Sequence, residues 1–204
     1  GPNFSFSIPD SLPSNARYDF LGFSLDSPLG IPAGPLLDSR WIKFAADMGF
    51  SLLTYKTIRS NSYLGHPLPN IIPIHRAAAF KSHEIRNELI LNDEEANEIN
   101  QLTITNSFGM PSMSQEYLKE DIPKSISYLS KNQLLIVSVV GSGSKRSDII
   151  DDFVDTAVFA HSCKAPVIEL NLSCPNLSEG KGELFQDPDL VKEICSKTHN
   201  ALPS

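Results

Sequence analysis

The chain has 204 residues, of which 41% are hydrophobic and 20% charged, and this composition is typical of one globular domain. Its formal net charge of -7 argues against nucleic acid or an anionic membrane surface as the main partner. No apolar run approaches the roughly 20 residues of a membrane span, and the N-terminus lacks the pattern of a secretory signal. Three cysteines without a CxxC pair favour a reducing compartment, with neither a disulfide framework nor a metal site, so we expect a cytoplasmic protein.

The first residues are predicted to be irregular. Residues 1–17 are rich in Ser, Pro and Asn, a composition that favours an irregular N-terminal arm. Residues 18–29 alternate weakly around Gly22, which indicates a small hairpin. Residues 30–35 then predict a short apolar strand that ends in a turn of glycine and proline.

A helix and a second strand are expected next. Asp38 or Ser39 is suited to cap the start of the helix, and Gly49 stands where glycine commonly follows a helix end. Residues 50–55 predict a buried strand, with Lys56 at its C-terminal end.

The following part of the chain is less regular. The prolines of residues 60–75 exclude a continuous helix or a central strand. Residues 76–101 are polar, with one short helix predicted over 92–100. Residues 102–105 predict a short strand.

Helices and strands alternate in the last part of the chain. The predicted elements are a helix over 115–130, a buried strand over 134–140, a helix over 148–162, a buried strand over 167–174, and a helix over 187–198. Asp187 is suited to cap this last helix, with Pro188 in its first turn. Strands that alternate with helices imply a parallel sheet with right-handed crossovers. Four such units are half of a (β/α)8 barrel, so the pattern leaves open either a barrel fragment or a shorter open-sheet protein.

Polar side chains gather at the end of the last predicted strand. Asn171, Ser173, Cys174 and Asn176 lie within six positions, and Pro175 prevents the strand from continuing. Polar groups at the end of a buried strand are costly unless they bind something, and ligands bind at this edge of parallel α/β proteins. From its position alone, Cys174 is either a small core residue or a reactive thiol.

Other strand ends carry further candidates. Gly34 is either a turn glycine or a point where the backbone approaches a flat cofactor. Lys56 either extends to solvent or supplies a positive charge to an anionic ligand or a reduced cofactor. Asn106, Ser107 and Gly109 are either a simple polar turn or part of a site, and Asn171, Ser173 and Asn176 are either site residues or caps for the next helix. The five histidines show no metal-ligand spacing and lie outside these clusters, so we expect them to be structural or surface residues.

These stretches, in this order, resemble the dihydroorotate dehydrogenase family, and most closely its soluble class with a cysteine base. The resemblance extends from about residue 18 to residue 200. Its most specific element is Glu169-Leu170-Asn171-Leu172-Ser173-Cys174-Pro175-Asn176. The other matching stretches are Pro32–Gly34, Thr54–Thr57 with the turn Gly65–Pro69, and Asn106–Pro111.

The resemblance implies a (β/α)8 barrel that holds FMN at the C-terminal face of its strands, with residues 18–204 supplying about the first half. The implied reaction is the oxidation of dihydroorotate to orotate in pyrimidine biosynthesis. Cys174 is then the base for the C5 proton, FMN accepts the hydride, and Lys56 contacts both flavin and substrate. The implied flavin contacts are Ala33, Gly34, Lys56, Thr57 and Asn171. The implied substrate contacts are Lys56, Asn106, Ser107, Phe108, Gly109, Met110, Asn171 and Asn176. A homodimer and a soluble electron acceptor are also expected.

Several positions depart from the family pattern. His66 and Ser112 stand where the family commonly has asparagine, and Asn70 stands where it has arginine. Residues 75–101 form an insertion relative to soluble family members. A dihydropyrimidine dehydrogenase-like flavoenzyme is one alternative, although Asn176 favours dihydroorotate. An inactive barrel fragment or binding module is the other.

Overall fold

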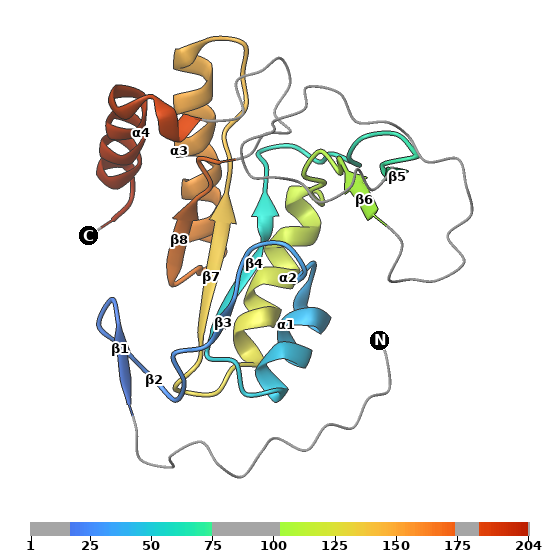
Figure 1. The fold of residues 1–204 in the computed structure, drawn as a ribbon. Helices are drawn as coiled ribbons and strands as arrows, with labels where there is room; N and C mark the ends of the chain where they lie inside the picture. The colour runs from blue at the N-terminus through green and yellow to red at the C-terminus, as the bar shows by residue number, and fades with distance from the viewer. Residues whose placement is uncertain (1–16, 75–102, 174–183, 204) are drawn as a thin grey trace, which may run out of the picture.

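The computed structural model describes residues 17–74, 103–173 and 184–203 (Figure 1). The following predictions therefore lie outside the described residues: the arm over 1–17 except for Arg17, the insertion over 75–101, the helix over 92–100, and the site residues Cys174 and Asn176. In chain order, the described elements are β1 (Tyr18–Phe20), β2 (Phe23–Leu25), β3 (Gly30–Ile31), α1 (Ser39–Asp47), β4 (Leu52–Ile58), β5 (Ile71–Ile74), β6 (Thr103–Asn106), α2 (Gln115–Ser127), β7 (Leu134–Val139), α3 (Arg146–Ser162), β8 (Val167–Leu170), the 3-10 helix η2 (Leu184–Gln186) and α4 (Pro188–Ala201).

The central sheet has the strand order β3-β4-β7-β8, and every neighbouring pair is parallel. α1 packs against β4, α2 against α1 and β7, and α3 against β7 and β8, whereas α4 packs against α3 (Figure 1). Because all four strands run the same way, their C-terminal ends lie along one edge of the sheet. The parallel β/α alternation predicted from the sequence is confirmed, and it brings Gly34, Lys56, Thr57 and Asn171, which lie at or after the ends of β3, β4 and β8, to the same edge.

The core lies between the sheet and the helices. Leu53 and Leu135 face each other across β4 and β7, and so do Tyr55 and Val137, and all four are almost completely buried. Each of the four α-helices in the described ranges adds a buried side chain, namely Ile42, Ile122, Phe153 and Ile194.

Local sequence signals set the helix ends. The Asp38 carboxylate accepts hydrogen bonds from the backbone of Arg40 and Trp41, and α1 is followed by Gly49 at φ +89°. Asp187 caps α4 in the same way through Leu190 N–H. Both caps, and the β1–β2 hairpin, agree with the sequence predictions.

A buried carboxylate ties α1, α2 and β4 together. Asp121 on α2 accepts hydrogen bonds from Ser39 N–H at 2.8 Å, from the Ser39 hydroxyl at 2.6 Å and from the Tyr55 hydroxyl at 2.6 Å. Burial, and then the hydrogen bond to Asp121, raise the pKa of Tyr55 above its ordinary value, so its hydroxyl remains a donor. These hydrogen bonds fix β4 at Tyr55, one residue before Lys56.

Three strand predictions need correction. β4 extends to Ile58, so Lys56 lies inside the strand rather than at its end. β8 ends at Leu170 and is only partly buried, because among the described strands it has β7 as its single neighbour. β5 was not predicted; it pairs antiparallel with β6 outside the central sheet, where an edge position accommodates Pro73.

None of the helices formed by the described residues is long and apolar enough to cross a membrane. Of the cysteines within the described ranges, Cys163 is buried, Cys195 is exposed, and neither forms a disulfide.

Candidate functional site

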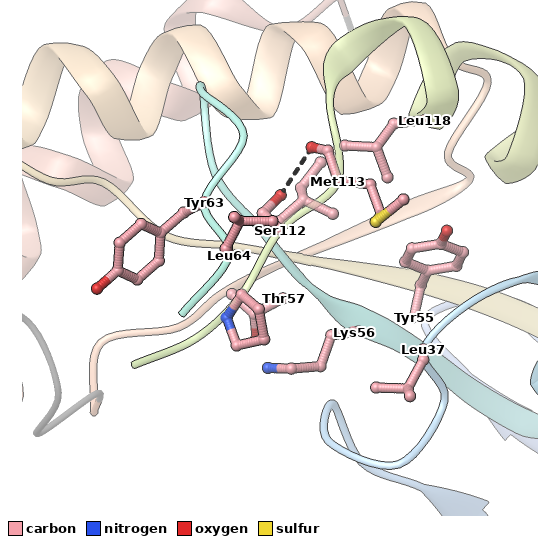
Figure 2. A pocket seen from close by; sticks show the side chains of 11 residues that line it. Leu37, Tyr55, Lys56, Thr57, Tyr63, Leu64, Ser112, Met113 and Leu118 are labelled. Carbon is pink, nitrogen blue, oxygen red and sulfur yellow. Dashed lines mark hydrogen bonds between the residues drawn. The ribbon is translucent and has the colours of Figure 1, made fainter. Parts of the chain in front are cut away.

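An irregularity in β4 sets the direction of two predicted site residues. Between its pairs with Val137 and Val139, β4 has two residues, Lys56 and Thr57, where β7 has only Ser138. Such a bulge interrupts the regular alternation of side chains between the two faces of a strand. It places Thr57 against Ser138 and leaves the Lys56 side chain directed into a pocket (Figure 2).

Hydroxyl and amide groups connect three strand ends. The Asn171 side-chain amide donates to Thr57 Oγ1 at 3.1 Å, and the Thr57 hydroxyl donates to Ser138 Oγ at 3.0 Å. The Asn171 backbone N–H donates to Val139 O at 2.9 Å. The structure therefore brings Thr57 and Asn171 together, although 114 positions separate them in the sequence. Ser138 was not singled out by the sequence analysis, since a lone serine in an apolar strand carries no signal of function.

Lys56 lines a cavity of about 250 Å³, which is bounded in part by Leu37, Leu64 and Met113 (Figure 2). Its backbone N–H donates to Leu36 O at 2.9 Å and so anchors the loop that follows β3. Within the described ranges, no carboxylate forms an ion pair with the Lys56 ammonium; the ion pairs found there involve other cations.

Burial, and then the nearby charge of Arg59, lower the pKa of Lys56 from its ordinary value. A half-buried cation beside a second cation is unfavourable unless something compensates its charge. The cavity is therefore suited to an anionic group.

The loop that carries Gly34 is open to solvent or ligand. Ala33 and Gly34 are both partly buried, and a Cβ added at Gly34 would meet no atom within 4 Å. No neighbouring side chain therefore requires a glycine at this position. The free space is compatible with the close approach of a flat cofactor.

The turn after β6 is held by the segment after β4. His66 N–H donates to Phe108 O at 3.0 Å, and His66 Nδ1 lies 2.9 Å from Ser107 Oγ. Gly109 has φ +74°, and a Cβ on it would lie 2.5 Å from the His66 ring. His66 is thus a surface residue with a structural contact, as expected for the histidines, but it contacts the polar turn from which the sequence separates it. No sequence signal could have found this contact, which depends on the tertiary structure.

Two more residues secure the same turn. Arg59 donates to the carbonyls of Gly109 and Met110, and its backbone N–H donates to Ser112 Oγ. In the sequence, Ser112 stands out only as a departure from a family pattern, and Arg59 carries no signal of function.

The predicted substrate contacts do not all line one cavity. Asn106 and Ser107 line a second cavity of about 300 Å³ together with His66 and Asn70. Phe108 is 44% exposed, whereas Gly109 and Met110 are buried.

Comparisons with known proteins agree with this architecture. A family model described as dihydroorotate dehydrogenase matches residues 95–202, more than half of the chain. A dihydroorotate dehydrogenase of Dictyostelium discoideum is 46% identical over 189 residues, which are 91% of this chain and 51% of that protein. The catalytic subunit of an NAD-dependent dihydroorotate dehydrogenase B of Bacteroides thetaiotaomicron is 37% identical over 76 residues, which are 37% of this chain and 22% of that protein.

Solved structures show the same fold. DHODH of Eimeria tenella in complex with ferulenol superimposes with a TM-score of 0.65 at 17% identity, covering 95% of this chain and 46% of that one. A ligand-free DHODH structure from the same organism gives a TM-score of 0.62 at 18% identity, covering 92% of this chain and 47% of that one.

The described fold is thus a partial (β/α)8 barrel, as predicted from the sequence. The chain belongs to the dihydroorotate dehydrogenase family. It spans about half the length of the curated Dictyostelium relative and of the Eimeria structures that it matches.

Proposed function

We propose that the protein containing this chain oxidises dihydroorotate to orotate, with FMN as its cofactor. The single observation that carries this proposal is the half-buried Lys56, which lines an open cavity without a carboxylate partner among the described residues. Orotate and dihydroorotate carry a carboxylate, and FMN carries a phosphate and becomes electron-rich when reduced. Each can supply the negatively charged partner that the Lys56 ammonium does not have among the described residues.

The described residues fit a flavin. Gly34 offers free space for a flat ring, and Asn171, which is held by the buried Thr57 hydroxyl, offers a partly exposed amide at the same edge of the sheet. Ala33, Gly34, Lys56, Thr57 and Asn171 would hold the cofactor in the proposed arrangement. When bound, FMN supplies the acceptor for the hydride that leaves C6 of dihydroorotate.

The chain's own residues supply the proton chemistry and orient the substrate. Cys174, which lies outside the described residues, is proposed to accept the C5 proton on its Sγ, because an accessible thiolate is a suitable base near neutral pH. The amides of Asn106, Asn171 and Asn176 are proposed to pair with the pyrimidine, since amides offer both donors and acceptors.

The remaining proposed contacts surround the carboxylate end of the substrate. Lys56 would attract the carboxylate, and the backbone around Phe108, Gly109 and Met110 would bind it, whereas the Ser107 N–H already donates to Asn70 O. In this arrangement Lys56 and the turn bind the carboxylate, whereas the asparagine amides bind the pyrimidine ring.

The visible absorption spectrum of the purified holoprotein tests the proposal. We expect a yellow protein whose flavin absorbance bleaches when dihydroorotate is added without oxygen. Cys174→Ala is expected to abolish the bleaching, whereas Cys195→Ala, a change at an exposed thiol on α4, should leave it intact. A full-length protein that remains colourless when FMN is supplied would refute the enzyme proposal and favour a binding module.

The choice of pyrimidine is tested in the same experiment. A yellow protein that responds to dihydrouracil but not to dihydroorotate would favour the dihydropyrimidine dehydrogenase-like alternative. The homodimer, the soluble electron acceptor and the cytoplasmic location remain predictions from the sequence.

A further inference from the structure

Arg59, which directly follows β4, reaches across to the turn after β6. Its Nε donates to Met110 O and its Nη2 donates to Gly109 O, both at 3.1 Å. The guanidinium carbon lies 4.7 Å from the centre of the Tyr63 ring. One planar side chain therefore binds two consecutive carbonyls and is itself supported by an aromatic ring.

This turn needs such support because of its backbone conformation. Gly109 has φ +74° and Met110 has φ +56°, so two consecutive residues adopt the left-handed region. For a residue with a side chain, such as Met110, this conformation is less stable by roughly 1–2 kcal/mol than the right-handed one. The carbonyls of Gly109 and Met110 also point to the same place, and this arrangement is stable only while a cation binds both of them. The contacts of Arg59 offset both costs.

The positions of the carbonyls determine where the amides point. In a trans peptide the C=O and the N–H lie on opposite sides of the chain. The Gly109 carbonyl faces Arg59, so the N–H of Met110 is directed away from the guanidinium. The Phe108 carbonyl faces His66 N–H, so the N–H of Gly109 is directed away from His66.

Neither of these two N–H groups donates to a protein acceptor within residues 17–74, 103–173 and 184–203, although both residues are buried. A buried backbone N–H without an acceptor is costly, so the pair is suited to a ligand oxygen.

We propose that Arg59 is a positioning residue, which holds the Gly109–Met110 peptide so that these backbone N–H groups bind the carboxylate end of the substrate. The proposal rests on the proposed dihydroorotate chemistry. Arg59 acts through the turn and touches neither the reacting atoms nor the flavin. Its charge also lowers the pKa of Lys56, so the two cations lie in the same region and have different tasks.

The test compares full-length FMN-loaded variants with the wild-type protein. Arg59→Met removes both donors, and we expect the KM for dihydroorotate and the dissociation constant of orotate to rise by about tenfold to a hundredfold, the loss expected for hydrogen bonds from a charged donor. At saturating substrate kcat should change by less than about threefold, because a residue that acts only through binding leaves the chemical step intact. FMN content should be unchanged. Orotate binding is measured from the change in flavin absorbance.

Two further variants keep the test decisive. Arg59→Lys retains the positive charge and most of the side chain, so it should fold even if Arg59→Met does not. A single ammonium cannot reproduce the planar two-donor contact, and we expect an intermediate rise in both constants. Arg146→Met makes the same change at an exposed arginine at the start of α3 and should leave both constants unchanged.

The outcomes separate the inference from the proposed function. If wild-type holoprotein neither binds orotate nor oxidises dihydroorotate, the proposed function fails and the inference falls with it. If the wild type is active and Arg59→Lys matches it in both constants, the inference alone is overturned. Loss of thermal stability in the Arg59 variants with unchanged KM would show a purely structural role and would also overturn it.

Discussion

The side-chain amide of Asn171 donates a hydrogen bond to the hydroxyl of Thr57 at 3.1 Å, across 114 positions of sequence. The same hydroxyl donates to Ser138, so one threonine joins the ends of β4, β7 and the segment after β8. Because Thr57 is fully buried, water is poorly placed to replace either bond. The two hydrogen bonds of Thr57 therefore link the stability of the sheet edge to the position of Asn171 in the proposed flavin site.

Replacing Thr57 with valine should therefore affect both stability and cofactor binding. Valine has the same shape and lacks the hydroxyl, so Asn171 loses an acceptor and Ser138 loses a donor. We expect the free energy of unfolding to fall by about 1–3 kcal/mol and FMN to bind more weakly. Chemical denaturation and fluorescence titration with FMN measure the two effects. Thr57→Ser keeps the hydroxyl and should retain FMN binding; equal weakening in both variants would contradict the role of the hydrogen bonds.

Gly34 allows the flavin site to be separated from fold stability. A Cβ at this position meets no protein atom within 4 Å, so Gly34→Ala should leave the thermal stability of the FMN-free protein unchanged or slightly higher. If the flavin ring lies against Gly34, the added methyl group occupies its space and FMN affinity falls. Differential scanning fluorimetry and FMN titration are the measurements. Wild-type FMN affinity in this variant would place the cofactor elsewhere.

The sequence predicted the helices and strands whose signals lie within the element itself or next to it. The capping carboxylates of Asp38 and Asp187 contact N–H groups two or three residues away, and apolar periodicity indicated the strands and helices of the sheet. Lys56, Thr57 and Asn171 were also predicted as site residues. Their proximity follows from the rule that parallel strands end at one edge.

The remaining contacts could not be read from the sequence, because they join segments that are distant in the chain. Arg59 binds carbonyls about 50 positions away, and His66 contacts a residue 41 positions away. The extra residue in β4 is visible only against its pairing with β7. A pattern based on neighbouring residues contains no information about such contacts.

The close contact between Gly109 and His66 predicts a specific pair of effects. Gly109→Ala forces a methyl group into the His66 ring and also strains a backbone with φ +74°. We expect orotate affinity to fall and the melting temperature to decrease. Adding His66→Ala removes the clash and leaves the backbone strain, so the double variant should recover part of the stability. Melting temperatures of the two single variants and the double variant provide the test. Strictly additive losses would show that the two residues do not clash.

Asp121 should be the most sensitive of the residues away from the site. Its carboxylate is buried and accepts three hydrogen bonds from Ser39 and Tyr55. Asp121→Ala leaves these donors without an acceptor, and we expect a loss of about 3–5 kcal/mol in the free energy of unfolding. Glu120→Ala changes an exposed carboxylate one position earlier on α2 and should cost no more than about 0.5 kcal/mol. Urea denaturation distinguishes the two, and similar losses would contradict the proposed importance of the buried contact.

The lowered pKa of Lys56 predicts how orotate binding changes with pH. Its causes are burial and then the charge of Arg59, so the ammonium loses its proton at a lower pH than the ordinary 10.5. Only the charged form attracts a carboxylate, and a bound carboxylate in turn raises the pKa. Orotate affinity should therefore be constant while Lys56 is charged in the free protein. It should weaken as the pH rises through the lowered pKa.

Titration of the holoprotein with orotate from neutral to alkaline pH, followed by flavin absorbance, measures this dependence. We expect Lys56→Gln to bind orotate more weakly at neutral pH and to retain only the pH dependence that comes from the ligand and from other groups. The difference between the two profiles isolates Lys56. Arg59→Met removes the neighbouring charge that lowers the pKa, so its alkaline transition should move to higher pH. Identical profiles for wild type and Lys56→Gln would show that Lys56 does not meet the carboxylate as a cation.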